Sequence, residues 1–138
     1  MKIKEKLYLS NPDKVYKAIN NLWADFPEYD KARENMFVLY LDVKNKLLCI
    51  ELHSQGTIDQ CIVYPREIIR KGLFCNCAGI ILVHNHPSEN TNPSNSDNKL
   101  TEQIKTVANY MDIKLLDHVI ISNFDDKGFY SFNQEGDL

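Results

Sequence analysis

The stretch AGIILVHNHPSENTNPSNSD, residues 78–97, joins an apolar run to a polar loop that begins with two histidines. Its run from Gly79 to Val83 predicts a short buried strand that delivers the first histidine. Residues i and i+2 of an extended segment point the same way, so His84 and His86 can converge on one point. Asp97 opens a helical pattern after the loop, and its carboxylate can return to that point. Two imidazoles and one carboxylate leave a fourth tetrahedral position open, as in catalytic zinc sites.

The spacing of these residues resembles a known metalloprotease signature. The pattern H-x-H-P, six residues, S-x-x-D is similar to that of the JAMM superfamily, whose domains are also called JAB or MPN domains; it is carried here by His84, His86, Pro87, Ser94 and Asp97. The blocks RENMFVLYLDVKNKLL, YPREI, HNHPS and LLDHVIIS occur in the order seen in the RadC-like branch. The resemblance is strongest over residues 33–132.

The hydrophobic pattern predicts alternating helices and strands. A helix is expected to begin at Asn11-Pro12-Asp13, because proline is favoured in a first helical turn. Further helices are predicted from Pro65 and over about 96–111, and strands over 36–42, 47–52, 56–63, 79–83, 115–122 and 129–132, with a polar turn at 123–127. The pattern indicates an α/β domain with three α-β-α layers. The resemblance implies a JAB/MPN-like (cytidine-deaminase-like) fold, a curved mixed β-sheet flanked by helices.

Composition is typical of one globular domain. The chain has 138 residues, of which 43% are hydrophobic and 25% charged, and a net charge of −3. We expect a single RadC-like JAB domain over 1–138 without a helix-hairpin-helix domain. The net negative charge and the lack of a clustered basic patch argue against direct nucleic-acid binding, which we do not expect. No apolar run spans a bilayer and the N-terminus lacks a signal-like segment, so the expected location is cytoplasmic, without a membrane partner.

Hydrolysis needs a group that takes up a proton and returns it to the leaving amine. The chain has no H-E-x-x-H helix that would supply it. Glu34 stands directly before the predicted strand 36–42, and the resemblance implies that it is the catalytic acid/base. An exposed surface charge is the alternative for Glu34, and Glu51 and Glu67 are competing carboxylates, although a helix dipole alone would explain Glu67.

Three further residues are candidates for the site. The resemblance implies that Ser94 assists the oxyanion, while helix capping by Ser94 or Ser96 is an alternative that is compatible with it. Asp117 and His118 lie in the LLDHVIIS block, where we expect structural or outer support of the metal ligands, or a buried hydrogen-bonded pair, in preference to direct catalysis. His53 is expected to be an exposed turn residue.

The sequence departs from the typical RadC-like loop after Ser88, where residues 89–92 differ. The extra carboxylate of Glu89 could alter which substrates are accepted. Glu89 stands where glycine is usual, and a non-glycine residue is strained at positive φ, so the loop path is expected to differ. Asn85 lies between the histidines in place of the serine or threonine of the deubiquitinating branch, which weakens the case for ubiquitin-like substrates.

Together these features predict a zinc-dependent metallohydrolase, a JAMM-type metallopeptidase that cleaves a peptide or isopeptide bond of a peptide or protein through a metal-activated water. His84, His86 and Asp97 would hold one Zn²⁺ per chain, Glu34 would move the proton, and Ser94 would assist the oxyanion. The alternative is a non-catalytic or DNA-repair-associated interaction module of the RadC family. A metal-dependent nuclease is a third possibility, which a single mononuclear site and little basic surface disfavour.

Overall fold

The structure, a computed structural model of the chain, describes residues 6–56, 62–88, 90–122 and 128–138. Within these ranges the strands form one mixed sheet in the order β2-β1-β3-β4-β5. Only β3 and β4 are parallel, and the other neighbours are antiparallel. The elements are α1 (Pro12–Trp23), α2 (Glu28–Lys31), β1 (Asn35–Leu41), β2 (Leu47–Gln55), α3 (Pro65–Phe74), β3 (Gly79–His86), α4 (Asn95–Tyr110), β4 (Lys114–Ser122) and β5 (Phe129–Ser131).

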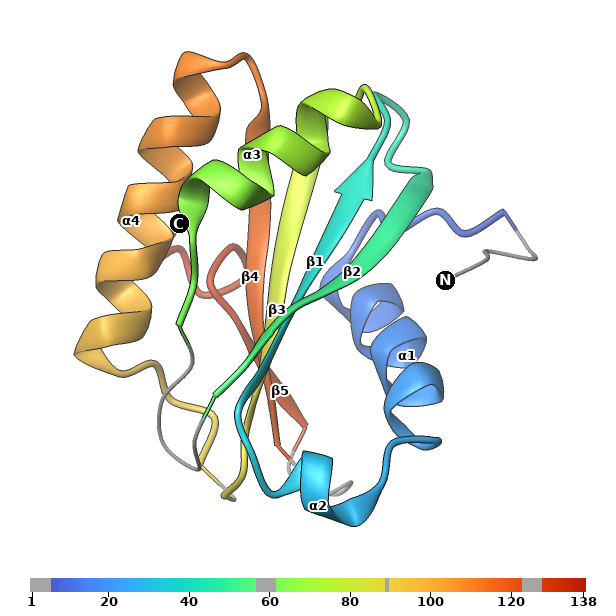
Figure 1. The fold of residues 1–138 in the computed structure, drawn as a ribbon, viewed down its shortest axis with the longest axis vertical. Helices are drawn as coiled ribbons and strands as arrows, with labels where there is room; N and C mark the ends of the chain where they lie inside the picture. The colour runs from blue at the N-terminus through green and yellow to red at the C-terminus, as the bar shows by residue number, and fades with distance from the viewer. Residues whose placement is uncertain (1–5, 57–61, 89, 123–127) are drawn as a thin grey trace.

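The helices cover both faces of this sheet. Figure 1 shows α1 on one face and α3 and α4 on the other. The predicted α/β architecture with three layers is therefore confirmed, and the mixed sheet with flanking helices is consistent with a JAB/MPN-like fold. Among the helices of the described ranges, none combines the length and apolarity that crossing a membrane requires.

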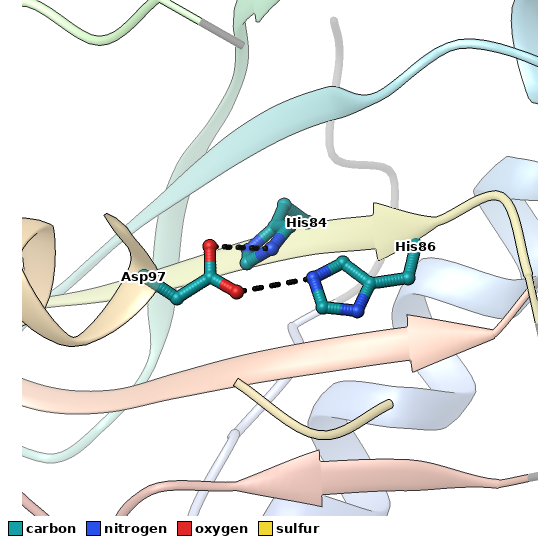
Figure 2. Close-up of side chains that lie close together, drawn as sticks. All are labelled: His84, His86 and Asp97. Atoms are coloured by element: carbon teal, nitrogen blue, oxygen red, sulfur yellow. Dashed lines mark hydrogen bonds and ion pairs between the residues drawn. The ribbon is translucent and has the colours of Figure 1, made fainter. Parts of the chain in front are cut away.

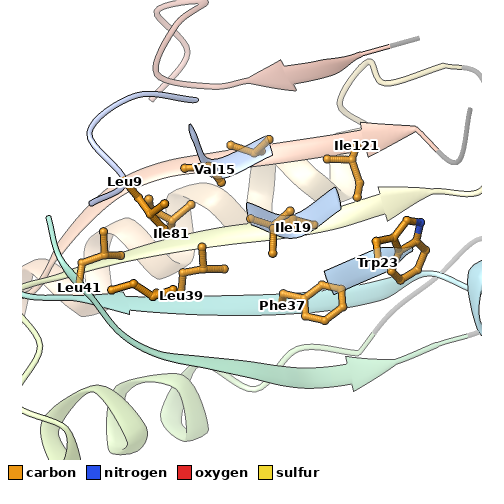
Figure 3. Packing of buried hydrophobic residues seen from close by; sticks show 12 residues of the cluster. Leu9, Val15, Ile19, Trp23, Phe37, Leu39, Leu41, Ile81 and Ile121 are labelled. Atoms are coloured by element: carbon orange, nitrogen blue, oxygen red, sulfur yellow. The ribbon is translucent and has the colours of Figure 1, made fainter. Parts of the chain in front are cut away.

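The core under α1 is built around one cluster of apolar side chains. Side chains from one stripe of α1 meet every second residue of the central strands (Figure 3), and the cluster comprises Leu9, Val15, Ile19, Trp23, Phe37, Leu39, Leu41, Leu47, Ile81, Val83, Val119 and Ile121. The helix begins as predicted, with Pro12 in its first turn and the Asn11 side chain accepting a hydrogen bond from the Lys14 amide at 3.0 Å.

On the opposite face of the sheet, which α3 and α4 cover, the core is apolar except at one end of β3. Ile80 and Leu82 of β3 pack with Ile104 and Ala108 of α4 in a second apolar cluster. Because side chains alternate along a strand, His84 follows on the same face at the next position. The apolar layer thus ends at a histidine.

The strand β4 carries an irregularity that decides which of its residues face α4. Ile80 pairs with Leu115, but Ile81 pairs with Asp117, so Leu116 is skipped in the β3–β4 register. Leu115 packs in the α4-side core and Leu116 packs against the α1-side core. Beyond the skipped residue the alternation is restored, and His118 faces α4.

Several predicted boundaries change. β3 runs to His86, so both histidines belong to the strand itself. The predicted strand 56–63 falls mostly outside the described residues, and Gly56 and Val63 are not in a strand; the predicted turn 123–127 also lies outside them. The prediction of His53 as an exposed turn residue is wrong. Its side chain is 4% exposed within β2, and its Nε2 accepts a hydrogen bond from the Tyr64 amide at 3.0 Å.

We expect Ile19→Ala to lower the free energy of unfolding by about 2–5 kcal/mol, because the substitution leaves a cavity between α1 and the sheet. Ile19 is fully buried. Chemical denaturation of the variant would measure the loss, with the exposed Lys17→Ala on the same helix as the matched control. Equal stability of the two variants would contradict the packing of α1 on this face.

Candidate metal centre

Three side chains from two elements meet at the end of β3. His84 and His86 project from the same face of the strand, and Asp97 reaches them from the first turn of α4 (Figure 2). The Nε2 atom of His84 lies 3.2 Å from Asp97 Oδ1, and that of His86 lies 3.1 Å from Asp97 Oδ2. Each oxygen of one carboxylate therefore faces a different imidazole.

The orientation of the Asp97 carboxylate is set by the start of α4. Ser94 is the N-cap, and its hydroxyl accepts a hydrogen bond from the Asp97 amide at 3.0 Å. In return Asp97 Oδ2 accepts one from the Ser94 amide at 2.8 Å. This reciprocal capping box satisfies two amide groups that the helix itself leaves unpaired. The same contacts hold the carboxylate toward the histidines.

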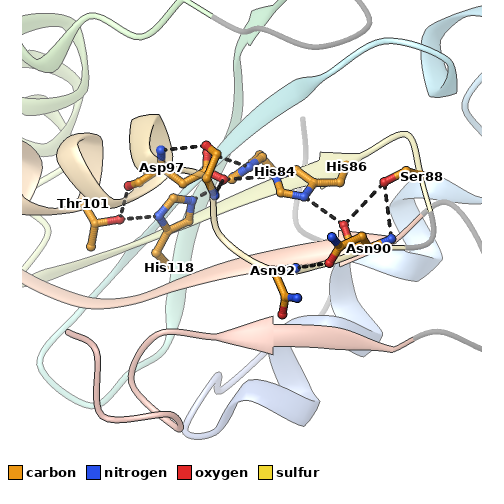
Figure 4. A network of polar contacts seen from close by, with 9 residues as sticks. His84, His86, Ser88, Asn90, Asn92, Asp97, Thr101 and His118 are labelled. Atoms are coloured by element: carbon orange, nitrogen blue, oxygen red, sulfur yellow. Dashed lines mark hydrogen bonds and ion pairs between the residues drawn. The ribbon is translucent and has the colours of Figure 1, made fainter.

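A carbonyl group in the loop fixes the tautomer of His86. Its Nδ1 lies 3.0 Å from the carbonyl oxygen of Asn90, and Ser88 and Asn92 bond to Asn90 in turn (Figure 4). A carbonyl oxygen can only accept, so Nδ1 carries a hydrogen. In the neutral ring the lone pair then lies on Nε2, which is the atom that faces Asp97.

The environment of His84 is more enclosed. Its side chain is 2% exposed, and its Nδ1 lies 2.8 Å from Nε2 of the buried His118. Its Nε2 is buried without a hydrogen-bond partner despite the nearby carboxylate. A buried polar atom without a partner is costly. A cation between Nε2 and the carboxylate would remove that cost.

The donor atoms suit a metal ion. One ligand atom from each of His84, His86 and Asp97 lies within 4.8 Å of the other two. Imidazole nitrogen and carboxylate oxygen are common ligands of zinc and of other divalent transition metals. This group could therefore bind a metal ion.

The electrostatics of the group favour an ionised Asp97 carboxylate and a protonated His86. Burial alone would raise the pKa of Asp97, but contacts with His84 and His86 outweigh it and hold that pKa far below its usual range. Burial alone would lower the pKa of His86, but Asp97 and the Asn90 carbonyl outweigh it, so the pKa is raised. Burial, with the charge of His84, lowers the pKa of His118 well below its ordinary value, so its ring is neutral.

Glu34 lies directly before β1, on the side of His86. Met36 pairs with His84 across β1 and β3, and two further steps along this antiparallel register lead from Met36 to Glu34 and from His84 to His86. The charge of Glu34 contributes to the raised pKa of His86. The half-buried Glu34 therefore lies within electrostatic reach of His86.

The competing carboxylates occupy other surroundings. Glu51 lies on β2 beside His53, with Oε1 3.4 Å from Nδ1. Glu67 lies in the first turn of α3 and pairs with Arg70 at 2.8 Å. Neither Glu51 nor Glu67 is among the main causes of the pKa shifts of His86 and Asp97. Glu89 falls outside the described residues.

The segment that carries Glu34 is clamped by two buried asparagines, which sequence analysis did not assign to the site. Asn85 Oδ1 accepts from the Asn35 amide at 2.7 Å, and Asn85 Nδ2 donates to the Arg33 carbonyl at 2.9 Å. Asn35 Nδ2 donates to the Asp30 carbonyl at 2.8 Å. Asn85 points away from the histidines on either side of it. A polar residue at the inward-facing position of a buried strand was the signal that could have identified it.

Asp117 and His118 form a hydrogen bond through the His118 amide, while their side chains bind different partners. Asp117 accepts hydrogen bonds from the His118 amide at 2.7 Å, the Ser131 hydroxyl at 2.6 Å and the Asn133 amide at 3.0 Å. Neighbouring strand residues face opposite sides of a sheet, so Asp117 points to the α1 side and His118 points toward His84. Asp117 thus ties β4 to β5 and the residues that follow it.

Comparison with known proteins agrees with this geometry. The family model described as RadC-like JAB domain matches residues 9–137. The chain belongs to the RadC-like JAB domain family. Similar proteins include a "UPF0758 protein" of Histophilus somni (strain 2336), 48% identical over 108 residues, and one of Chlorobium chlorochromatii (strain CaD3), 42% identical over 107 residues. Each alignment covers 78% of this chain and 47% of the relative.

A third relative extends the match along most of the chain. A "UPF0758 protein" of Janthinobacterium sp. (strain Marseille) is 38% identical over 130 residues, which are 94% of this RadC-like domain and 54% of the relative. The chain thus spans about half the length of the curated relatives it matches. The expected resemblance to RadC-like proteins is confirmed.

We expect metal affinity to rise with pH and then level off, because the proton on His86 competes with a metal ion for the Nε2 lone pair. The pKa of His86 is raised above its ordinary value of 6.5, so the competition extends above that pH and disappears beyond the raised pKa. Asp97 stays ionised throughout this range because its pKa is lowered. Competition with a chromogenic chelator, from below pH 6.5 to well above it, would measure the dependence. An affinity that does not change over this range would contradict the assigned role of His86.

Proposed function

We propose that this RadC-like domain is a zinc-dependent hydrolase that cleaves a peptide or isopeptide bond. The observation that carries the proposal is the convergence of two imidazole Nε2 atoms and one carboxylate, with the His84 atom buried and unpartnered. Peptides and proteins are the proposed substrate class, both for this chain and for longer family members.

Zinc suits this donor set better than a hard cation does. His84, His86 and Asp97 would supply two nitrogens and one oxygen, whereas magnesium and calcium prefer all-oxygen sites. With three protein ligands, bound zinc supplies a Lewis acid with an open position that activates water near neutral pH. The neutral tautomer of His86, set by the Asn90 carbonyl, leaves the nitrogen that faces Asp97 ready for coordination.

Glu34 is the proposed proton carrier. Its carboxylate lies within electrostatic reach of His86, at the start of a strand that pairs with β3. It would accept a proton from the attacking water and deliver it to the leaving nitrogen. The Asn35 and Asn85 contacts hold the backbone on either side of Glu34, which limits its movement during this transfer.

Ser94 is compatible with both roles considered for it. Capping uses its hydroxyl oxygen as an acceptor for the Asp97 amide. The hydroxyl hydrogen is not used in that contact and could donate to an oxyanion that forms beside the metal ligands. The capping role follows from the structure, and the oxyanion role is part of the proposal.

We expect purified wild-type protein to hold about one zinc per chain, as the open three-ligand site implies. The double variant His84→Ala/His86→Ala, and separately Asp97→Ala, should lose the metal. Elemental analysis with matched circular dichroism would measure content and folding together. Wild-type protein that stays empty after zinc is supplied would overturn the proposal and favour the interaction module.

We expect Glu34→Gln to keep zinc and lose about 10²- to 10⁴-fold in turnover, which is the usual contribution of a general acid/base. A fluorogenic library of peptides joined by α-peptide or lysine ε-isopeptide bonds would provide the assay. Glu67→Gln, on an exposed helix turn away from the site, is the matched control. Full turnover in Glu34→Gln would contradict its assignment, and loss in Glu51→Gln instead would move the role to Glu51.

A further inference from the structure

We propose that Thr101 and His118 are positioning residues that determine which nitrogen of His84 is available to a metal ion. The inference rests on the metal site of the proposed function and adds two residues that do not touch the metal. It concerns the direction in which hydrogen bonds run through a buried polar chain on the α4 side of the sheet.

The chain of hydrogen bonds consists of three short contacts, each of which shares a residue with the next (Figure 4). His84 Nδ1 lies 2.8 Å from His118 Nε2, and His118 Nδ1 lies 2.7 Å from Thr101 Oγ1. The Thr101 hydroxyl donates to the Asp97 carbonyl oxygen at 2.7 Å. His84, Thr101 and His118 are all at most 2% exposed, so water does not compete for these contacts.

The carbonyl end of the chain determines its direction. The Asp97 carbonyl can only accept, so the single hydroxyl hydrogen of Thr101 is committed to it. Thr101 Oγ1 must then accept from His118 Nδ1–H. A neutral His118 with its hydrogen on Nδ1 has its lone pair on Nε2, which accepts from His84 Nδ1–H. The hydrogen of His84 is thereby held on Nδ1, and its Nε2 lone pair faces Asp97.

The opposite direction would block the site. If Thr101 donated to His118 Nδ1, then His118 Nε2–H would donate to His84 Nδ1, and the hydrogen of His84 would move to Nε2. That nitrogen could not bind a metal ion while protonated. It would also be expected to make a hydrogen bond to Asp97, whereas His84 Nε2 has no hydrogen-bond partner in the structure.

Two other features keep the His118 ring in place. Phe132 stacks on it, with ring centroids 4.8 Å apart and an interplanar angle of 6°. The skipped residue Leu116 sets the alternation that turns His118 toward α4. Because the ring plane is fixed by packing, both of its nitrogens are aimed at their partners without a further cost in side-chain entropy.

The chain of hydrogen bonds also connects His84 and Asp97, the two proposed metal ligands at its ends. Asp97 contributes its carboxylate to His84 Nε2 and its carbonyl to Thr101, so both ends of the chain return to the same residue. A loop of contacts therefore links the first turns of α4 to β3. Outer partners of this kind typically change metal affinity about 10- to 100-fold when they are removed.

The test compares three variants by zinc affinity, measured with a competing chelator. Thr101→Val removes the hydroxyl and should weaken zinc binding about 10- to 100-fold. Thr101→Ser keeps the hydroxyl and should stay close to wild type. Ser131→Ala is the matched control: it loses a buried hydroxyl contact to Asp117 of 2.6 Å on the opposite face of the sheet, and should also leave zinc affinity close to wild type.

A second measurement tests the direction without any variant. Long-range nitrogen–proton NMR of metal-free wild-type protein, in which no bound ion dictates the tautomer of His84, should show the hydrogen of His118 on Nδ1 and none on Nε2. A hydrogen on Nε2 would overturn the proposal, as would equal zinc affinity in Thr101→Val and Thr101→Ser. This readout decides the matter even if Thr101→Val does not fold.

The outcomes also separate this inference from the proposed function. Wild-type protein that binds no zinc would overturn both. Tight zinc binding without hydrolysis of any library peptide would count against the hydrolase and leave the affinity comparison intact. An equal loss of affinity in Thr101→Val and Ser131→Ala would overturn the positioning roles alone, because a general loss of packing would then explain it.

Discussion

The carboxylate of Asp97 joins the architecture of the domain to its candidate chemistry. Its amide and side chain close the capping box with Ser94, so the start of α4 and the direction of the carboxylate are fixed together. Without it, the Nε2 atoms of His84 and His86 would lose the oxygens that they face, and α4 would lose its capping box. Because Asp97 caps α4 and also contacts two imidazoles of β3, it restricts how α4 and β3 can be placed relative to each other.

Much of the fold follows from local patterns. The proline after Asn11, the apolar stripe of α1 and the buried run of β3 predict elements that the structure contains. The spacing of the two histidines and Asp97 also predicts their convergence, because strand alternation and helix capping are short-range constraints. Such features depend on neighbours in sequence, so one sequence is enough to infer them.

The remaining parts of the site depend on contacts between distant segments. Thr101 is an ordinary helix residue by sequence, and only the packing of α4 brings it to His118. The Asn35–Asn85 contacts join positions fifty residues apart. The separate surroundings of the Asp117 and His118 side chains could not be read from sequence for a related reason, since strand geometry turns neighbouring side chains to opposite faces of the sheet. His53 was misplaced because β2 is longer than its apolar core suggests.

The skipped residue at Leu116 limits how the length of β4 can change in this chain. Deleting Leu116 would exchange the two faces of the part of β4 that precedes it. Apolar Leu115 would be offered to the α1 layer, where Leu116 now packs. In a regular strand, residues three apart face opposite sides of the sheet; the irregularity lets apolar Leu115 and His118 both face α4.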